Sequence, residues 1–171
     1  MVKKWLILDL DETLIDWDAN LLINNEVLNR LIELHETQHY GLALASFNDS
    51  ATEILQHLQI DRLFSIISGG IKPHNYDIHT YSFSKVDNIL EIMRTTGQFN
   101  PDDYVFLDNE YINCLHVSKY LGVPHVEINP ATGITMFNID QALDYLDKKE
   151  NIKIIKRYTK KFKITLDDHF Y

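Results

Sequence analysis

Residues 5–13 read Trp-Leu-Ile-Leu-Asp-Leu-Asp-Glu-Thr, and this stretch decides the fold. Its apolar start is the pattern of a short buried β-strand, which ends in the carboxylates Asp9 and Asp11, with Thr13 two residues further on. In an open parallel sheet, ligands bind beyond the carboxyl ends of the strands. The two carboxylates point to the same face of the sheet if the strand continues through both. If the strand ends at Asp9, the conformation of the turn determines where Asp11 points. The stretch therefore places two acids where such a fold binds its ligand.

Two later apolar runs also end in polar residues. The run 42–45 is followed by Ser46-Phe47-Asn48, and the run 104–107 is followed by Asp108-Asn109-Glu110. Lys85 lies between them, at the predicted start of a helix. Magnesium prefers oxygen ligands, and lysine is a common point charge for phosphate. Two acidic sites and a lysine therefore indicate a site for a phosphoryl group and a magnesium ion.

The apolar periodicity predicts alternating strands and helices. Predicted strands span residues 5–8, 42–46, 63–67, 104–107 and 123–128; predicted helices span 25–36, 86–94 and 111–121, and another runs through Leu58 from a cap at Asp49 or Ser50. This order is typical of an α/β protein with a doubly wound parallel sheet and right-handed crossovers.

The motifs, in this order, resemble those of the haloacid dehalogenase (HAD) superfamily of phosphotransferases. The first motif matches Asp9, Asp11 and Thr13, the second Ser46, the third Lys85, and the fourth Asp108-Asn109. The resemblance covers residues 3–130, is strongest to the magnesium-dependent phosphatase branch, and implies a Rossmann-like core. The Asp-Asn form of the fourth motif is similar to that of small phosphatases acting on the polymerase C-terminal domain. Because Asn109 carries no charge, we expect weaker magnesium binding than with a second aspartate.

The resemblance also implies roles for these residues. Asp9 is the expected nucleophile and Asp11 the general acid and base, with Ser46 and Lys85 completing the catalytic set. The expected phosphate-binding residues are Thr13, Ser46, Asn48 and Lys85. The expected cofactor is Mg²⁺, held by Asp9, the main-chain carbonyl of Asp11 and Asn109, with Asp108 either a further ligand or the residue that orients Lys85. Lys72, followed by Pro73, is the alternative third-motif lysine; the shorter gap from Lys85 to Asp108 fits one helix and a short loop better.

The spacing between motifs is too short for a large cap domain, so we predict an open site with a small flap at residues 15–23. An open site suits a phosphorylated protein or a small phosphoester. Two alternatives stay open. One is a phosphatase acting on nucleic-acid ends, and the other is a catalytically weak binding module with the HAD fold, in which Asn109 would indicate the loss of activity.

The composition is that of a globular protein of 171 residues, with 45% hydrophobic and 24% charged residues. No apolar run approaches the ~20 residues of a membrane helix, so no membrane partner is expected. Asp9 and Asp11 interrupt the first apolar run too soon for a signal peptide. The chain has one cysteine, Cys114, which excludes an internal disulfide. We therefore expect a cytoplasmic protein.

The charge is uneven along the chain. Residues 148–163 hold eight of the 16 Lys and Arg residues, interleaved with apolar ones. We predict a core at residues 1–147 and a basic extension at 148–171 that packs on it. The alternative is a docking strip for nucleic acid or an acidic partner, which the acidic core disfavours.

Deleting residues 150–171 is therefore expected to lower the melting temperature, because the apolar residues of a packed extension would lose their contacts. Thermal unfolding of the full chain and the truncated chain measures the difference. A soluble truncation with an unchanged melting temperature would contradict the packed extension and favour the docking strip, which salt-dependent DNA or RNA binding would then test.

Overall fold

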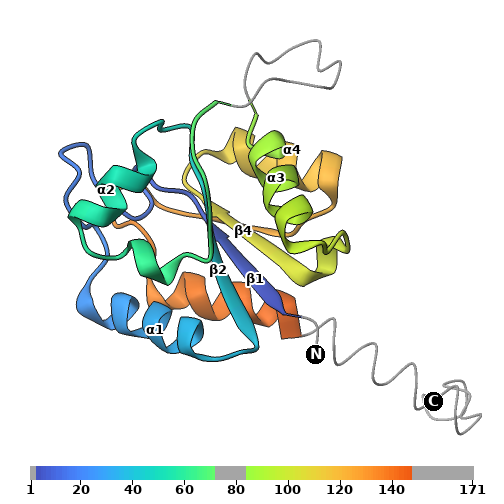
Figure 1. Ribbon diagram of the computed structural model, residues 1–171, viewed down its shortest axis with the longest axis horizontal. Coiled ribbons are helices and arrows are strands. Elements are labelled where there is room, and N and C mark those ends of the chain that lie inside the picture. The colour runs from blue at the N-terminus through green and yellow to red at the C-terminus, as the bar shows by residue number, and fades with distance from the viewer. Residues whose placement is uncertain (1–2, 72–83, 148–171) are drawn as a thin grey trace, which may run out of the picture.

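The computed structural model describes residues 3–71 and 84–147 of the chain. It confirms the predicted parallel sheet, whose strand order is β3-β2-β1-β4-β5. Figure 1 shows β1 in the middle of the sheet, between β2 and β4. The strands are β1 (Lys4–Leu8), β2 (Tyr40–Ala45), β3 (Ile66–Ser68), β4 (Tyr104–Asp108) and β5 (His125–Glu127). The chain order reverses between β1 and β4, and this switch point is where open α/β sheets bind ligands.

Helices cover both faces of the sheet (Figure 1). The helices are α1 (Asn25–Glu36), α2 (Ala51–His57), α3 (Val86–Thr96), α4 (Tyr111–Leu121) and an unlabelled one at residues 136–147. One core cluster joins the sheet to α1, α2 and helix 136–147, and the second joins it to α3 and α4. The predicted bounds of α1 and α4 are confirmed, and α4 ends at Gly122 in the left-handed conformation.

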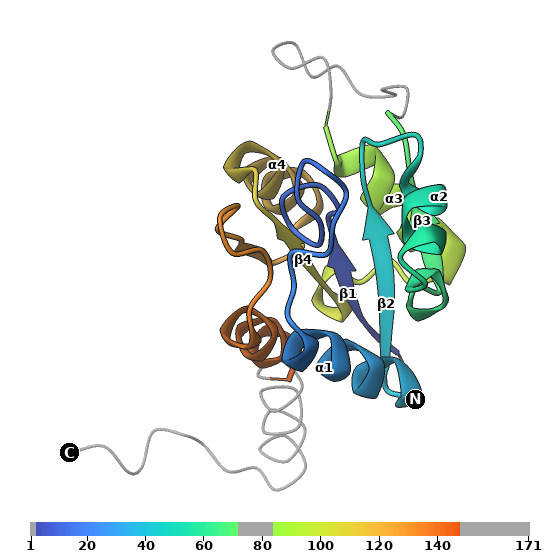
Figure 2. The ribbon, with the colours of Figure 1, turned by 90° about the vertical axis from the view of Figure 1, so that its left-hand side faces the viewer.

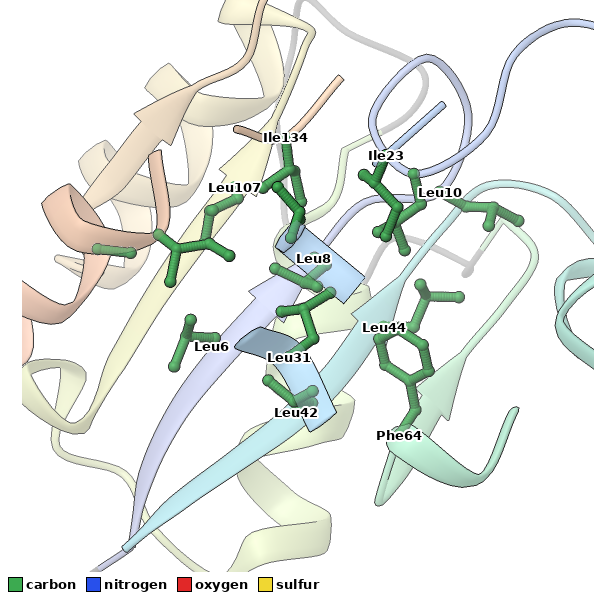
Figure 3. Packing of buried hydrophobic residues seen from close by; sticks show 14 of the residues in the cluster. Leu6, Leu8, Leu10, Ile23, Leu31, Leu42, Leu44, Phe64, Leu107 and Ile134 are labelled. Atoms are coloured by element: carbon green, nitrogen blue, oxygen red, sulfur yellow. The ribbon is translucent and has the colours of Figure 1, made fainter. Parts of the chain in front are cut away.

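The side chains of β1 alternate between the two faces of the sheet, which explains these two clusters. Leu6 and Leu8 pack towards α1, whereas Trp5 and Ile7 pack towards α3. Figure 3 shows Leu6 and Leu8 among the leucines that surround Leu31 of α1. A strand buried on both faces reads as a continuous apolar run, which is why β1 is clear in the sequence.

The predicted strand at residues 63–67 was wrong in its bounds. Leu63 ends a 3₁₀ turn, η1 (Asp61–Leu63), and β3 begins only at Ile66. The Phe64 amide donates to the Asp61 carbonyl, so the chain is still turning at this point. Leu63 and Phe64 reach the core from a turn, and a short apolar run does not distinguish this from a strand.

The sequence analysis did not predict helix 136–147. A reciprocal cap begins it: the Thr135 amide donates to the Asn138 side chain at 2.9 Å, and the Asn138 amide to the Thr135 hydroxyl at 3.4 Å. Its buried residues are Ile139, Ala142 and Leu146, at helical spacing. The cap and this spacing were the signals that could have found the helix.

Within residues 3–71 and 84–147, no segment folds as a separate cap domain, and no helix is long and apolar enough to cross a membrane. A second 3₁₀ turn, η2 (Pro101–Asp103), leads directly into β4. Lys72 and the basic extension 148–171 lie outside the described residues, so the domain division stays a prediction.

Gly41 gives a test of the packing between β1 and β2. It pairs with Trp5, and a Cβ atom at Gly41 would lie 2.6 Å from two carbons of the indole ring. The indole is held on its other side by a 3.0 Å hydrogen bond to Gln98. We expect Gly41→Ala to cost about 1–3 kcal/mol of unfolding free energy, as overpacking does.

Urea denaturation of Gly41→Ala measures this cost. Gly97→Asn is the matched control, because Gly97 has open space around its Cβ position and asparagine tolerates the left-handed conformation. Equal midpoints for Gly41→Ala and wild type would contradict the close approach.

Candidate active site

The predicted site residues come together at the carboxyl ends of β1, β2 and β4. Figure 2 shows β1 and β2 pointing the same way, with the loop that follows β1 lying at their arrowhead ends. A cavity of about 140 Å³ opens there. It is lined by Asp9, Asp11, Glu12, Phe47, Lys85, Asn109, Glu110 and Asn113.

Lys85 is the centre of this arrangement. It directly precedes α3, and its side chain is only 2% exposed. Its Nζ donates to a carboxylate oxygen of Asp9 and, at 2.8 Å, to the main-chain carbonyl of Ala45. The same Nζ lies 3.7 Å from Asp108 Oδ2 and 4.6 Å from the centroid of the Phe47 ring. One cation therefore links the ends of β1, β2 and β4.

Burial sets the protonation of the two partner carboxyls. Desolvation raises the pKa of Asp9, and the Lys85 ammonium opposes this rise. Desolvation, together with the nearby Asp9 charge, raises the pKa of Asp108 to about 7, again opposed by Lys85. Burial thus favours the neutral form of each carboxyl, and Lys85 is the main group that favours the charged form.

Asp108 is fully buried and is not among the residues that line the cavity. Its Oδ1 accepts from the Glu110 amide at 2.7 Å, and its Oδ2 accepts from the Asn113 side chain at 3.1 Å. The sequence left open whether Asp108 orients Lys85 or binds the magnesium ion. These contacts, with Lys85 beside Oδ2, favour the first role.

The loop after β1 carries the second carboxylate. Asp11 and Glu12 line the cavity, and Asp11 Oδ1 accepts a 3.3 Å hydrogen bond from the side chain of Asn48. The Asn48 oxygen in turn accepts from the Ser50 amide, which fixes the asparagine at the end of β2. Asp9 and Asp11 therefore face one cavity although the strand itself ends at Leu8.

Thr13 and Ser46 are fully buried and do not line the cavity. The Thr13 hydroxyl lies 3.2 Å from Asp9 Oδ2 and 3.4 Å from Asn109 Oδ1, towards both of which it is positioned to donate. Ser46 Oγ accepts from the Asn48 amide at 3.0 Å. Their predicted contacts with phosphate therefore stay predictions, while their contacts with other site residues are direct.

Four cavity residues had no role in the sequence analysis, namely Glu12, Phe47, Glu110 and Asn113. Glu12 and Phe47 lie beside motif residues, and Glu110 and Asn113 follow the fourth motif at the spacing Asp-Asn-Glu-x-x-Asn, which were the signals that could have found them. Cys114 lies next to Asn113 but is fully buried. Burial raises the pKa of its thiol to about 12, so it is not a thiolate nucleophile.

The donor atoms around the cavity fit a magnesium ion. Asp9, Asp11 and Asn109 supply only oxygen ligands, which suit this hard cation. Among the described residues, no group of three or more His, Cys, Asp or Glu side chains could hold a metal. A magnesium site here would therefore depend on the Asn109 amide oxygen and a main-chain carbonyl in addition to carboxylates.

The chain is similar in structure to several solved phosphatases and hydrolases. The N-terminal part of a Bacteroides fragilis protein, which contains a phosphatase domain and was solved with magnesium, matches with a TM-score of 0.63 at 22% identity over 84% of this chain. A haloacid dehalogenase-like hydrolase of Streptococcus pneumoniae matches with a TM-score of 0.56 at 14% identity, over 84% of this chain and 91% of its own.

The chain has the haloacid dehalogenase fold. A HAD family enzyme of Bacteroides thetaiotaomicron, in complex with magnesium and inorganic phosphate, matches with a TM-score of 0.52 at 14% identity over 78% of this chain and 97% of its own. The chain spans only 40% of the Bacteroides fragilis structure. No family model and no curated protein matches the sequence. Membership of the HAD superfamily, and the branch within it, therefore stay predictions.

Asn88 links the ends of β2 and β3 beneath this site. It is fully buried on α3, and its Nδ2 lies 3.1 Å from the Ser68 carbonyl, the Ser68 hydroxyl and the Gly70 carbonyl. The Ser46 carbonyl lies 3.4 Å away. Among the described residues its own Oδ1 has no hydrogen-bond partner, so the hydrogen bonds that its amide nitrogen donates hold the side chain in place.

Asn88→Ala should lower the unfolding free energy by about 2–3 kcal/mol, because it removes a buried donor that the oxygens at the ends of β2 and β3 share. Chemical denaturation measures the loss, and Asn20→Ala is the control, since Asn20 is an exposed asparagine that bonds to Asp16. If both variants unfold at the same midpoint, Asn88 does not tie the strand ends.

Proposed function

We propose that the protein is a magnesium-dependent phosphatase that hydrolyses phosphomonoesters through an aspartyl-phosphate on Asp9. The observation that carries the proposal is the buried Lys85 ammonium, which holds the Asp9 carboxylate at the base of the cavity. An ion pair that only stabilises the fold does not need a cavity beside it. Here the paired carboxylate borders a cavity lined by acids and amides, which is the arrangement that phosphoryl transfer needs.

In the first step, a carboxylate oxygen of Asp9 forms a bond to phosphorus while the bond from phosphorus to the leaving oxygen breaks. Asp11 gives its proton to that leaving oxygen. The hydrogen bond from Asn48 holds the Asp11 carboxyl in its place on the cavity wall. Lys85 fixes the attacking carboxylate, so part of the orientational cost is met before the substrate binds.

In the second step, a water oxygen forms a bond to phosphorus while the bond from phosphorus to the Asp9 oxygen breaks. Asp11 accepts the proton of this water, so phosphate is released and the Asp9 carboxylate is restored. Magnesium, held by Asp9, the Asp11 carbonyl and Asn109, would supply positive charge to the phosphoryl oxygens throughout. The Lys85 charge and the donors around Asp108 keep the site ordered between the two steps.

The proposed substrate is a phosphorylated protein or a small phosphoester. Support comes from the small loop that follows β1, since the described residues contain no separate cap to enclose the substrate. A phosphate displayed on a larger molecule can therefore approach the cavity. Nucleic acid held by the basic extension is the disfavoured alternative, and a cytoplasmic location stays a prediction.

Asp9→Asn should reduce phosphate release roughly 10³-fold or more, because an amide is a poor nucleophile of nearly the same shape. The fold should persist, because Asp108 still lies beside the Lys85 ammonium. Release of phosphate from an aryl phosphate, with and without magnesium, measures the effect, and circular dichroism checks the fold.

Asp18→Asn is the matched control, since it makes the same change on the exposed part of the loop after β1. It should retain wild-type activity. Wild-type activity in Asp9→Asn would remove Asp9 as the nucleophile. A wild-type protein that releases no phosphate from any substrate would instead favour the catalytically weak binding module.

A further inference from the structure

We propose that Glu12 is a positioning residue that orients the Asn109 amide, so that its oxygen rather than its nitrogen faces Asp9 and the magnesium site. The inference rests on the magnesium site of the proposed function. It assigns a role to a cavity residue that lies, in the sequence, between Asp11 and Thr13 of the first motif.

The contacts around Asn109 carry the inference. Its Oδ1 lies 3.4 Å from the Thr13 hydroxyl, which is also 3.2 Å from Asp9 Oδ2. Its Nδ2 donates to Glu12 Oε2 at 3.4 Å. The amide oxygen therefore points to the side of Asp9, and the amide nitrogen points to Glu12.

The backbone of Glu12 supports a functional reason for this contact. Its φ angle is +56°, in the left-handed region that non-glycine residues rarely adopt. The Glu12 amide donates to the Ile15 carbonyl at 2.7 Å, which holds the turn in this conformation. Glycine would fit the turn more easily, so a glutamate at this position favours a role for its side chain.

The orientation of Asn109 matters because an amide, unlike a carboxylate, has one accepting and one donating end. Rotation by 180° would present an NH₂ group to a cation and remove a ligand. An acceptor beside Nδ2 prevents this rotation. An aspartate at position 109 would not need the acceptor and would instead face Glu12 as a like charge.

The experiment measures magnesium binding without substrate, by titration calorimetry and by the magnesium-induced rise in melting temperature. Glu12→Gln removes the charge but keeps an oxygen that can accept from Asn109, whereas Glu12→Ala removes both. We expect magnesium to bind Glu12→Ala roughly 3- to 10-fold more weakly than Glu12→Gln, which is the effect of one hydrogen bond.

The control pair is Glu110→Gln and Glu110→Ala, since Glu110 lines the same cavity but makes no described hydrogen bond to the Asn109 side chain. These two variants should bind magnesium equally. In an Asn109→Asp background, the difference between Glu12→Gln and Glu12→Ala should disappear, because a carboxylate needs no orientation. Equal affinities of Glu12→Gln and Glu12→Ala, or a difference that persists with Asn109→Asp, would overturn the inference.

The two proposals fail in different ways. A wild-type protein that shows the expected magnesium pattern but releases no phosphate would overturn the proposed phosphatase and support the role of Glu12. Magnesium-dependent phosphate release together with equal affinities of the two Glu12 variants would overturn the role of Glu12 and leave the phosphatase standing. Absence of magnesium binding in the wild type would overturn both.

Discussion

The buried charge of Lys85 is the constraint on which the rest of the structure depends. An ammonium that is only 2% exposed is costly unless it is paired and hydrogen-bonded. Its position just before α3 adds to the cost, because a helix N-terminus repels cations. Asp9, Asp108 and the Ala45 carbonyl offset this cost together. The ends of β1, β2 and β4 must therefore lie side by side for the lysine to be buried at all.

The same arrangement that stabilises the lysine prepares the chemistry. The two carboxyls carry raised pKa values through burial, so their negative charge depends on the cation between them. Asp108 has further donors from Asn113 and Glu110, whereas Asp9 is the partner that borders the cavity. Both carboxylates pair with the lysine, but only Asp9 also faces the cavity, where a substrate could reach it.

The sequence predicted the sheet and the placement of the site because both depend on patterns that are local in the chain. β1 and β4 are buried on both faces and read as apolar runs, and the polar residues that follow them mark the strand ends. What could not be predicted depends on contacts between distant segments. The hydrogen bonds of Asn88 to Ser68 and Gly70, and of Asn109 to Glu12, leave no periodic signal. The bounds of β3 were missed because Leu63 is equally apolar in a turn and in a strand.

The charge of the cavity gives separate support for dependence on a cation. Four of its lining residues are carboxylic acids, Asp9, Asp11, Glu12 and Glu110, whereas Lys85 is the only basic residue among the described lining residues. The Lys85 charge is already shared between Asp9 and Asp108. A phosphate group carries negative charge, so it would enter a cavity that repels it. Oxygen ligands from Asp9, Asp11 and Asn109 can bind a divalent cation that reverses this repulsion. The acidic wall is thus unfavourable for phosphate alone and favourable for phosphate together with a metal ion, which is the condition that the proposed reaction requires.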